Sequence, residues 1–232
     1  MAAKGYQYYE VDAFPEWGIG SPPFETIHQD TLFREWVDEY PRTVITATGS
    51  ADHRDFLKFH VMHESTEKVR GRYINGPIHR YIAQNEFYIY YHPKLKRMFV
   101  DTSRPQCGEM IDRLGRCEID FLVIPRKVDL IQLGIDLKES IRGGWFGELK
   151  VADVSTIGIF SPTVGESSEW DRFEQMGRLK AIDLSLEFGD HKTPVKITQN
   201  RGIVLFETFP ESEALRWLLE LQSVLDSYII HE

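Results

Sequence analysis

The sequence feature that most constrains the fold is a pair of strand-like segments joined by a short turn. Residues 86–91 read EFYIYY, residues 97–101 read RMFVD, and the stretch HPKLK separates them. Aromatic and β-branched residues in short runs bounded by turn residues favour strands, so this region predicts a β-hairpin. Apolar and polar residues also alternate through 56–63, which is the period of a half-buried strand.

The C-terminal third continues this pattern and ends in a helix. Strand-like runs occur at 148–160, 178–188, 194–199 and 202–208, with GDHKT and QNRG as turn sequences. Leucines along one stripe of 211–227 predict an amphipathic helix. The other expected elements are strands at 6–12, 43–48 and 119–124, helices at 30–40 and 105–114, and loops at 13–28 and 161–177.

A leucine-striped segment in the middle of the chain marks the expected domain boundary. Apolar side chains recur there at helical spacing, at Leu130, Leu133, Leu137 and Ile141. We expect a helix over 126–142, ended by Gly143, that links a mixed α/β region of 1–142 to a region of 143–232. The second region is expected to be a β-meander closed by the C-terminal helix. The expected fold class is α+β with mainly antiparallel sheets.

Composition places the chain among ordinary globular proteins. Hydrophobic residues make up 42% and charged residues 27% of the 232 positions, which excludes disordered, collagen-like and disulfide-rich classes. No apolar run approaches the roughly 20 residues that span a bilayer, and the first residues lack the apolar core of a signal peptide. Cys107 and Cys117 fit no metal or redox spacing. We expect a cytoplasmic protein with no membrane span and no cofactor.

The stretch ALRWLLELQSVL at 214–225, following the strand-like runs, resembles the closing helix of a pleckstrin-homology-like domain. In that family an antiparallel meander is closed by one C-terminal helix that carries a tryptophan, here Trp217. The resemblance covers about 148–228 and implies a binding module without a catalytic centre. The sequence departs from the family in having fewer clear strands.

Common catalytic motifs are absent, and one weak nuclease pattern is present. The chain has no GxxxxGK[ST], GxSxG or HExxH sequence. Asp120, Glu148 and Lys150 could form a D…ExK centre, in which carboxylates hold Mg²⁺ and a lysine activates water. The alternative interpretation is a solvated carboxylate and lysine, because the ExK spacing also recurs elsewhere by chance.

Three histidines lie close together in the sequence but do not predict a metal site. Imidazoles of His53, His60 and His63 are of the type that binds Zn²⁺. On a strand, however, His60 and His63 fall on opposite faces, because side chains alternate with a period of two. We therefore interpret them as strand histidines and expect no metal ligands.

Charge is distributed unevenly along the chain. The formal net charge is −9, yet residues 54–104 hold ten Lys and Arg against five Asp and Glu, so this segment is +5 and the remainder −14. Histidines and tyrosines interleave with these cations. Cations neutralise phosphates and aromatic rings stack on bases, so the segment is a candidate nucleic-acid surface. The expected contact residues are Arg70, Arg72, Arg80, Lys94, Lys96 and Arg97.

Three functions remain open from these observations. The leading hypothesis is a non-catalytic binding or adaptor subunit, as part of a complex. It would contact a nucleic acid, another phosphate-bearing partner or a protein through the basic aromatic surface in 54–104. The second is a metal-dependent nuclease. The third is an accessory protein that docks through its acidic C-terminal half. One acidic stretch there is the loop expected at 161–177, with Glu166, Glu169, Asp171 and Glu174.

Overall fold

The computed structural model describes residues 3–18, 20–27, 41–51, 53, 55–73, 76–124, 126–150, 153–188 and 191–230. For residues 68–73, 76–80, 188 and 191 it describes the backbone alone. The chain forms two compact units, one of residues 10–124 and one of residues 1–9 with 125–232. We call these the N-terminal unit and the C-terminal unit.

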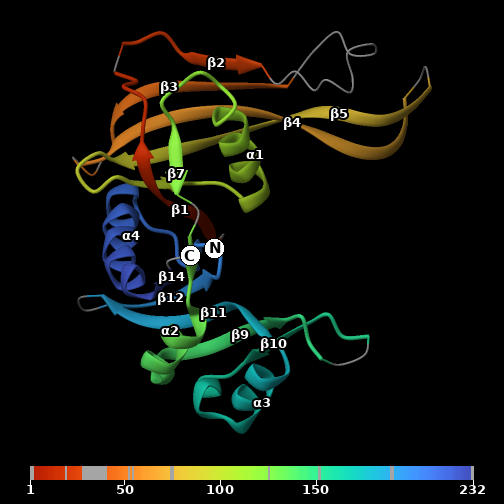
Figure 1. Ribbon diagram of the computed structural model, residues 1–232, viewed down its shortest axis with the longest axis vertical. Coiled ribbons are helices and arrows are strands. Elements are labelled where there is room, and N and C mark those ends of the chain that lie inside the picture. Colours follow the sequence, from red (N-terminus) through yellow and green to blue (C-terminus); the bar gives the residue numbers. More distant parts are fainter. Residues whose placement is uncertain are drawn as a thin grey trace. The chain divides into compact units, whose positions relative to one another are not determined.

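The N-terminal unit is an antiparallel meander with one helix. Its elements in chain order are the end of β1 (Lys4–Ala13), β2 (Phe24–Ile27), β3 (Arg42–Ser50), β4 (Leu57–Tyr73), β5 (Gly76–His92), β6 (Arg97–Val100), α1 (Arg104–Leu114) and β7 (Leu122–Ile124). The strands β2 to β6 are hydrogen-bonded in chain order. Figure 1 shows β2, β3, β4 and β5 of this series. The predicted hairpin is confirmed, since Ile89 pairs with Val100 and His92 with Arg97.

Alternate residues of β4 and β5 build the core of this unit. Phe59, Val61, Phe87 and Ile89 are each at most 4% exposed, and Phe59 lies opposite Ile89 in the register. The helix α1 contacts β4 and adds its own buried side chains, Cys107, Met110 and Leu114. The period-two alternation therefore separates a buried face of the hairpin from an outer one.

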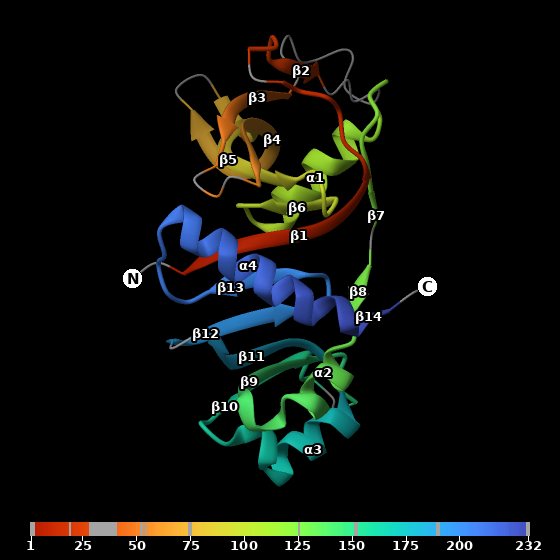
Figure 2. The same ribbon diagram turned by 90° about the vertical axis from the view of Figure 1, so that its left-hand side faces the viewer.

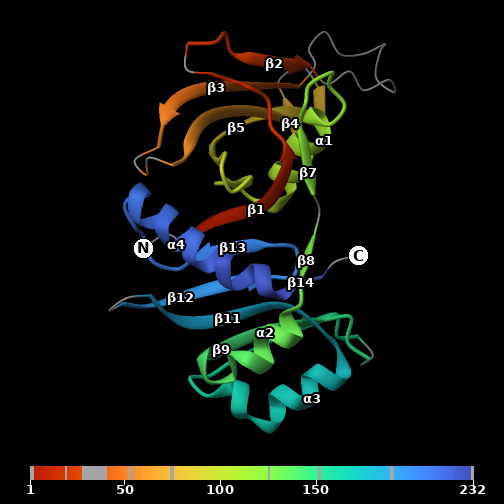
Figure 3. The same cartoon turned by 60° about the vertical axis from the view of Figure 1, so that its left-hand side comes forward.

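The C-terminal unit is also built on antiparallel strands. Its strands are β9 (Ile141–Gly147), β10 (Thr156–Phe160), β11 (Arg178–Phe188), β12 (His191–Thr198) and β13 (Gly202–Leu205), in the order β10-β9-β11-β12-β13 with the first residues of β1 next to β13. Figure 3 shows β11, β12 and β13 in succession. The remaining elements of this unit are β8 (Lys127–Val128), α2 (Leu130–Asp136), the 3₁₀ turns η2 (Lys138–Ser140), η3 (Val164–Glu166) and η4 (Asp226–Tyr228), α3 (Ser168–Met176), α4 (Glu211–Leu225) and β14 (Ile229–Ile230).

The helix α4 closes this sheet, as the C-terminal leucine stripe predicts. Figure 2 shows it lying across β13 and β12. Trp217 and Leu218 are at most 2% exposed, and the Tyr8 hydroxyl donates to Asp226 Oδ1 at 2.8 Å just after the helix. The expected class is thereby confirmed: the fold is α+β, its sheets are mainly antiparallel, and a C-terminal helix follows the meander.

The helix expected over 126–142 is much shorter, and this corrects the prediction. It begins at Leu130, because Asp129 Oδ1 accepts from the backbone amides of residues 131 and 132, and it ends at Asp136. Ile141, expected on the helix, instead starts β9 and pairs with Leu184. The predicted boundary at 142–143 falls inside β9.

Gly144 of β9 is closely packed, since a Cβ at this position would lie 2.6 Å from Trp170 Cζ3.

Several other expected elements differ from those observed. The segment 161–177, expected as a loop, contains η3 and α3, and Ser167 Oγ caps α3 by accepting from the Trp170 amide. The acidic residues Glu169, Asp171 and Glu174 thus lie on a helix. The expected loop 13–28 contains β2, and the strand run expected at 148–160 is β10 alone. The helix expected at 30–40 lies outside the described residues. Across the parts that are described, no helix is long and apolar enough to cross a bilayer.

Candidate functional site

The β4–β5 hairpin is longer than the strands beside it. Its register runs from Leu57 opposite Tyr91 to Tyr73 opposite Gly76, whereas β3 pairs with β4 only over 57–63 and β6 with β5 only over 89–92. Over the described backbone, residues 64–73 and 76–84 therefore pair in a ladder with each other alone. We call this two-stranded segment the ribbon. Figure 1 shows β4 and β5 continuing as a pair beyond α1.

The outer face of the hairpin carries cations beside aromatic rings. We define it by Lys58, His60 and Tyr88, which lie at even register positions, opposite to the buried face. The Lys58 ammonium lies 4.4 Å from the centroid of the Tyr88 ring, and the His60 ring centroid lies 5.5 Å from it. The Lys58–Tyr88 geometry is that of a cation–π contact. Tyr88 is half-buried, so part of its ring faces solvent.

The two strands of the ribbon, β4 and β5, carry three of the six predicted contact residues, Arg70, Arg72 and Arg80. Lys68 pairs with Arg80, which places both residues on the same side of the hairpin as the outer face. The register then shifts between Lys68 and Gly71, so that Gly71 lies opposite Ile78 and Arg72 opposite Pro77. Arg72 therefore occupies a position on the other side from Lys68 and Arg80. Arg70 lies within the shift.

The other three predicted contact residues lie at the opposite end of β5, in or next to the turn to β6. From Arg80 to His92 the strand covers about 40 Å at roughly 3.3 Å per residue. Lys96 Nζ donates to the Asp12 carbonyl at 3.1 Å, and Arg97 Nη1 lies 3.7 Å from Glu10 Oε1. Lys94 is exposed. The six cations thus form two groups, and acids of β1 pair with Lys96 and Arg97.

The residues of the predicted nuclease centre are divided between the two units. Asp120 is exposed in the N-terminal unit, and Glu148 and Lys150 are exposed in the C-terminal unit. The Glu148 carboxylate is an ion-pair partner of Lys180, and this hydrogen bond lowers the pKa of Glu148 below its ordinary value. Within the described ranges no three His, Cys, Asp or Glu side chains are grouped so that they could hold a metal ion.

The histidines of β4 follow the alternation of the strand. His60 is on the outer face, with Nε2 3.3 Å from Glu86 Oε2. His63 is fully buried on the opposite side, beneath α1. His53, outside β4, is half-buried and packs edge-on against Phe56 with a centroid distance of 5.6 Å.

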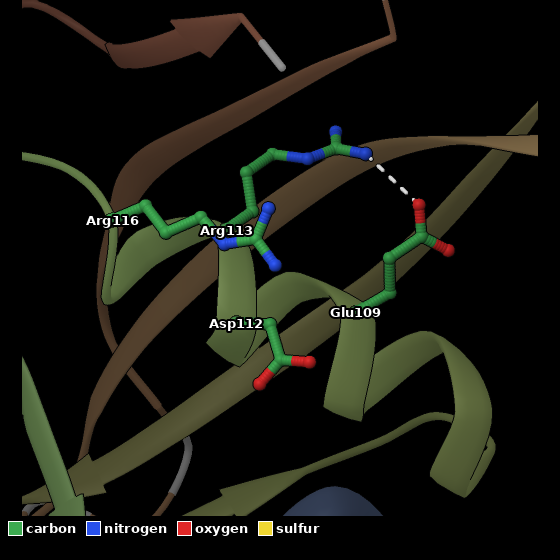
Figure 4. A pocket seen from close by; sticks show the side chains of 4 residues that line it. All are labelled: Glu109, Asp112, Arg113 and Arg116. Atoms are coloured by element: carbon green, nitrogen blue, oxygen red, sulfur yellow. Dashed lines mark hydrogen bonds and ion pairs between the residues drawn. The ribbon is translucent and has the colours of Figure 1, made fainter. Parts of the chain in front are cut away.

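A buried polar cluster around His63 was not predicted from the sequence. Arg113 of α1 is 3% exposed and donates to Thr43 Oγ1 at 2.8 Å, to the Glu64 carbonyl at 2.8 Å and to Glu109 Oε1 at 3.0 Å. Thr43 Oγ1 also lies 2.9 Å from His63 Nδ1. Figure 4 shows Arg113 extending along α1 toward Glu109. The cluster ties β3 and β4 to the helix.

His63 and Arg113 share the Thr43 hydroxyl. Arginine can only donate, so Thr43 Oγ1 accepts from Arg113, and the same oxygen is the hydrogen-bond partner of His63 Nδ1. His63 Nε2 lies 3.8 Å from Glu109 Oε2. Burial, and next the nearby Arg113 charge, lower the pKa of His63 from 6.5 to about 4. The ring is neutral at physiological pH.

The space beside this cluster is small and lined by mixed charges. A cavity of about 90 Å³ is bordered by Glu109, Asp112, Arg113 and Arg116. Ligand pockets are usually at least about 300 Å³, so we interpret the cluster as a structural anchor of α1. The sequence signal for it was the i,i+4 spacing of Glu109 and Arg113 on the predicted helix.

No family model and no curated protein matches the chain. Its function is therefore interpreted from the chemistry of its own residues.

Proposed function

We propose that the chain is a non-catalytic binding or adaptor subunit that contacts a nucleic acid through its segment 54–104. The observation that carries the proposal is the common face of the β4–β5 hairpin. Lys58, His60 and Tyr88 lie on it, and the opposed pair Lys68 and Arg80 occupies the same side in the register. Cations that neutralise phosphates, next to rings that can stack on bases, are the chemistry a nucleic acid requires.

Two acids, Glu64 and Glu86, lie on this side of the hairpin, against three Lys and Arg residues, Lys58, Lys68 and Arg80. Glu64 is engaged by Arg42, whose backbone amide donates to Glu64 Oε2 at 2.9 Å and whose guanidinium lies 3.6 Å from Oε1. Glu86 pairs with His60. The net charge of −9 opposes indiscriminate coating of nucleic acid, so binding is expected at this local face and at modest affinity.

Two further parts of the proposal rest on other residues. The C-terminal resemblance to a pleckstrin-homology-like domain stays a prediction, and it too implies a binding module. Cys107 and Cys117 are not joined by a disulfide, which supports a cytoplasmic setting for the proposed subunit.

Fluorescence anisotropy with labelled single-stranded and duplex oligonucleotides tests the proposal over a salt series, with Mg²⁺ or EDTA. We expect binding whose affinity falls as the salt concentration rises, and no cleavage of the oligonucleotides. Lys58→Glu should weaken it, whereas Lys150→Glu, the same charge change on the exposed surface of the other unit, should leave it unchanged. Absence of binding at low salt would overturn the proposal. Cleavage that EDTA abolishes would favour the centre of Asp120, Glu148 and Lys150 instead.

A further inference from the structure

We infer that the ribbon, residues 64–73 with 76–84, is the element that enters a groove of a nucleic-acid duplex. The inference rests on the proposed function and deepens it by naming the form of nucleic acid and the mode of contact. It depends on the backbone pairing of the ribbon and on the positions of its cations in the register.

The dimensions of the ribbon suit a groove. The ribbon has ten residues on β4 and nine on β5, and ten residues at about 3.3 Å each give a length of roughly 33 Å, close to the 34–36 Å of one turn of B-form DNA. Two strands about 4.8 Å apart, with their side chains, fit the roughly 12 Å width of the major groove, which admits a two-stranded ribbon. The ladder of residues 64–73 with 76–84 has no third strand on either side within the described backbone. A wider sheet would not enter.

The ribbon carries an excess of cations. It has four, Lys68, Arg70, Arg72 and Arg80, against two acids, Glu64 and Glu67. Glu64 is engaged by Arg42, and Glu67 Oε2 accepts from the Tyr81 hydroxyl at 2.6 Å. Lys68 and Arg80 are directly opposite in the register, so the ladder brings two cationic residues to one place along the ribbon. Cations placed in this way are suited to neutralise a phosphate.

The register shift distributes these cations over both sides of the ribbon. Lys68 and Arg80 occupy positions on one side, and Arg72, opposite Pro77, occupies a position on the other. A ribbon inserted with its two strands across the groove has one phosphate wall along each strand, and both strands carry cations: Lys68, Arg70 and Arg72 on β4, and Arg80 on β5. The ribbon also has only two tyrosines, Tyr73 and Tyr81, as stacking platforms for four cations. Both features favour a duplex over an unpaired strand.

The test compares a fluorescein-labelled 20-base-pair duplex with its single strand, using the full chain and anisotropy at several salt concentrations. In Lys68→Ala with Arg80→Ala, duplex affinity should fall about tenfold or more and the slope of log K against log salt should decrease by about two. The matched control is Lys138→Ala with Lys192→Ala, two exposed lysines of the C-terminal unit, which should change duplex affinity less than about twofold. Lys94→Ala with Lys96→Ala, in the turn after β5, tests that turn as the competing contact. Thermal unfolding of these double variants checks that each is folded.

Each outcome has one meaning. Duplex binding that depends on Lys68 and Arg80 and exceeds single-strand binding supports the inference. Binding to the single strand but not to the duplex overturns it and leaves the proposed function intact. Duplex binding that only the Lys94 and Lys96 substitutions weaken also overturns it, because the contact is then at the turn. Binding to neither oligonucleotide overturns the proposed function as well.

Discussion

Replacing His63 by asparagine should remove a large part of the acid sensitivity of folding. In the folded chain His63 is completely buried, its Nδ1 is hydrogen-bonded to Thr43 Oγ1 at 2.9 Å, and the ring faces Arg113 and Glu109 of α1. The side-chain amide of asparagine can take the place of Nδ1 in this hydrogen bond. His63→Asn therefore removes the titrating group while it keeps one hydrogen bond of the cluster.

The magnitude follows from the difference between the two pKa values of His63. The pKa is 6.5 in the unfolded chain and about 4 in the folded one. Well above pH 6.5 the ring is neutral in both states, so its titration does not change the free energy of unfolding. As the pH falls toward 4, only the unfolded chain binds the proton, so the free energy of unfolding decreases. The linkage relation gives a loss of about 2 kcal/mol between pH 7.5 and pH 5.

Urea unfolding at pH 7.5 and pH 5, followed by circular dichroism, measures this loss. The wild type should lose about 2 kcal/mol more than His63→Asn over this interval. His92, whose pKa burial also lowers, is present in both proteins and cancels in the difference. His60→Asn, three residues away on the outer face, is the matched control and should retain the acid sensitivity. Equal pH dependence in the wild type and His63→Asn would refute the assignment of His63 as a buried neutral ring.

Two further predictions concern packing and hydrogen bonding. Thr43→Val keeps the shape of the side chain but leaves an Arg113 donor and His63 Nδ1 without their shared hydroxyl, so unfolding in urea should show a loss of about 1–3 kcal/mol; a loss below about 0.5 kcal/mol would mean that the cluster rearranges at little cost. Gly144→Ala would place a Cβ 2.6 Å from Trp170 Cζ3 and should destabilise the chain by about 1–3 kcal/mol. Its matched control is Gly108→Ala inside α1, where no atom lies within 4 Å of the added Cβ and where we expect a gain of about 0.5–1 kcal/mol. If both glycine variants melt at the same temperature, the close packing of Gly144 against Trp170 is not the constraint inferred.

Local patterns predicted the elements whose stability depends on near neighbours in the sequence. The hairpin of 86–91 with 97–101 and the helix at the C-terminus are both present, because turn chemistry and apolar periodicity act over a few residues. The segment 126–142 has the same helical periodicity, but only Leu130–Asp136 of it forms an α-helix. Pairing of Ile141 with Leu184 buries it in β9, a contact between residues far apart in the chain. Helical spacing alone cannot reveal such a competitor.

The candidate site divides in the same way. The excess of cations in 54–104 is a property of composition and needs no structure. The strand register places Lys68 opposite Arg80 and Arg72 at a position on the other side of the hairpin. Lys94 follows the end of β5 that is remote from Arg80. The hidden cluster of Thr43, His63 and Arg113 also depended on the docking of α1 against β3 and β4. Composition and period come from the chain itself, whereas neighbours across a sheet are selected by the free energy of the whole fold.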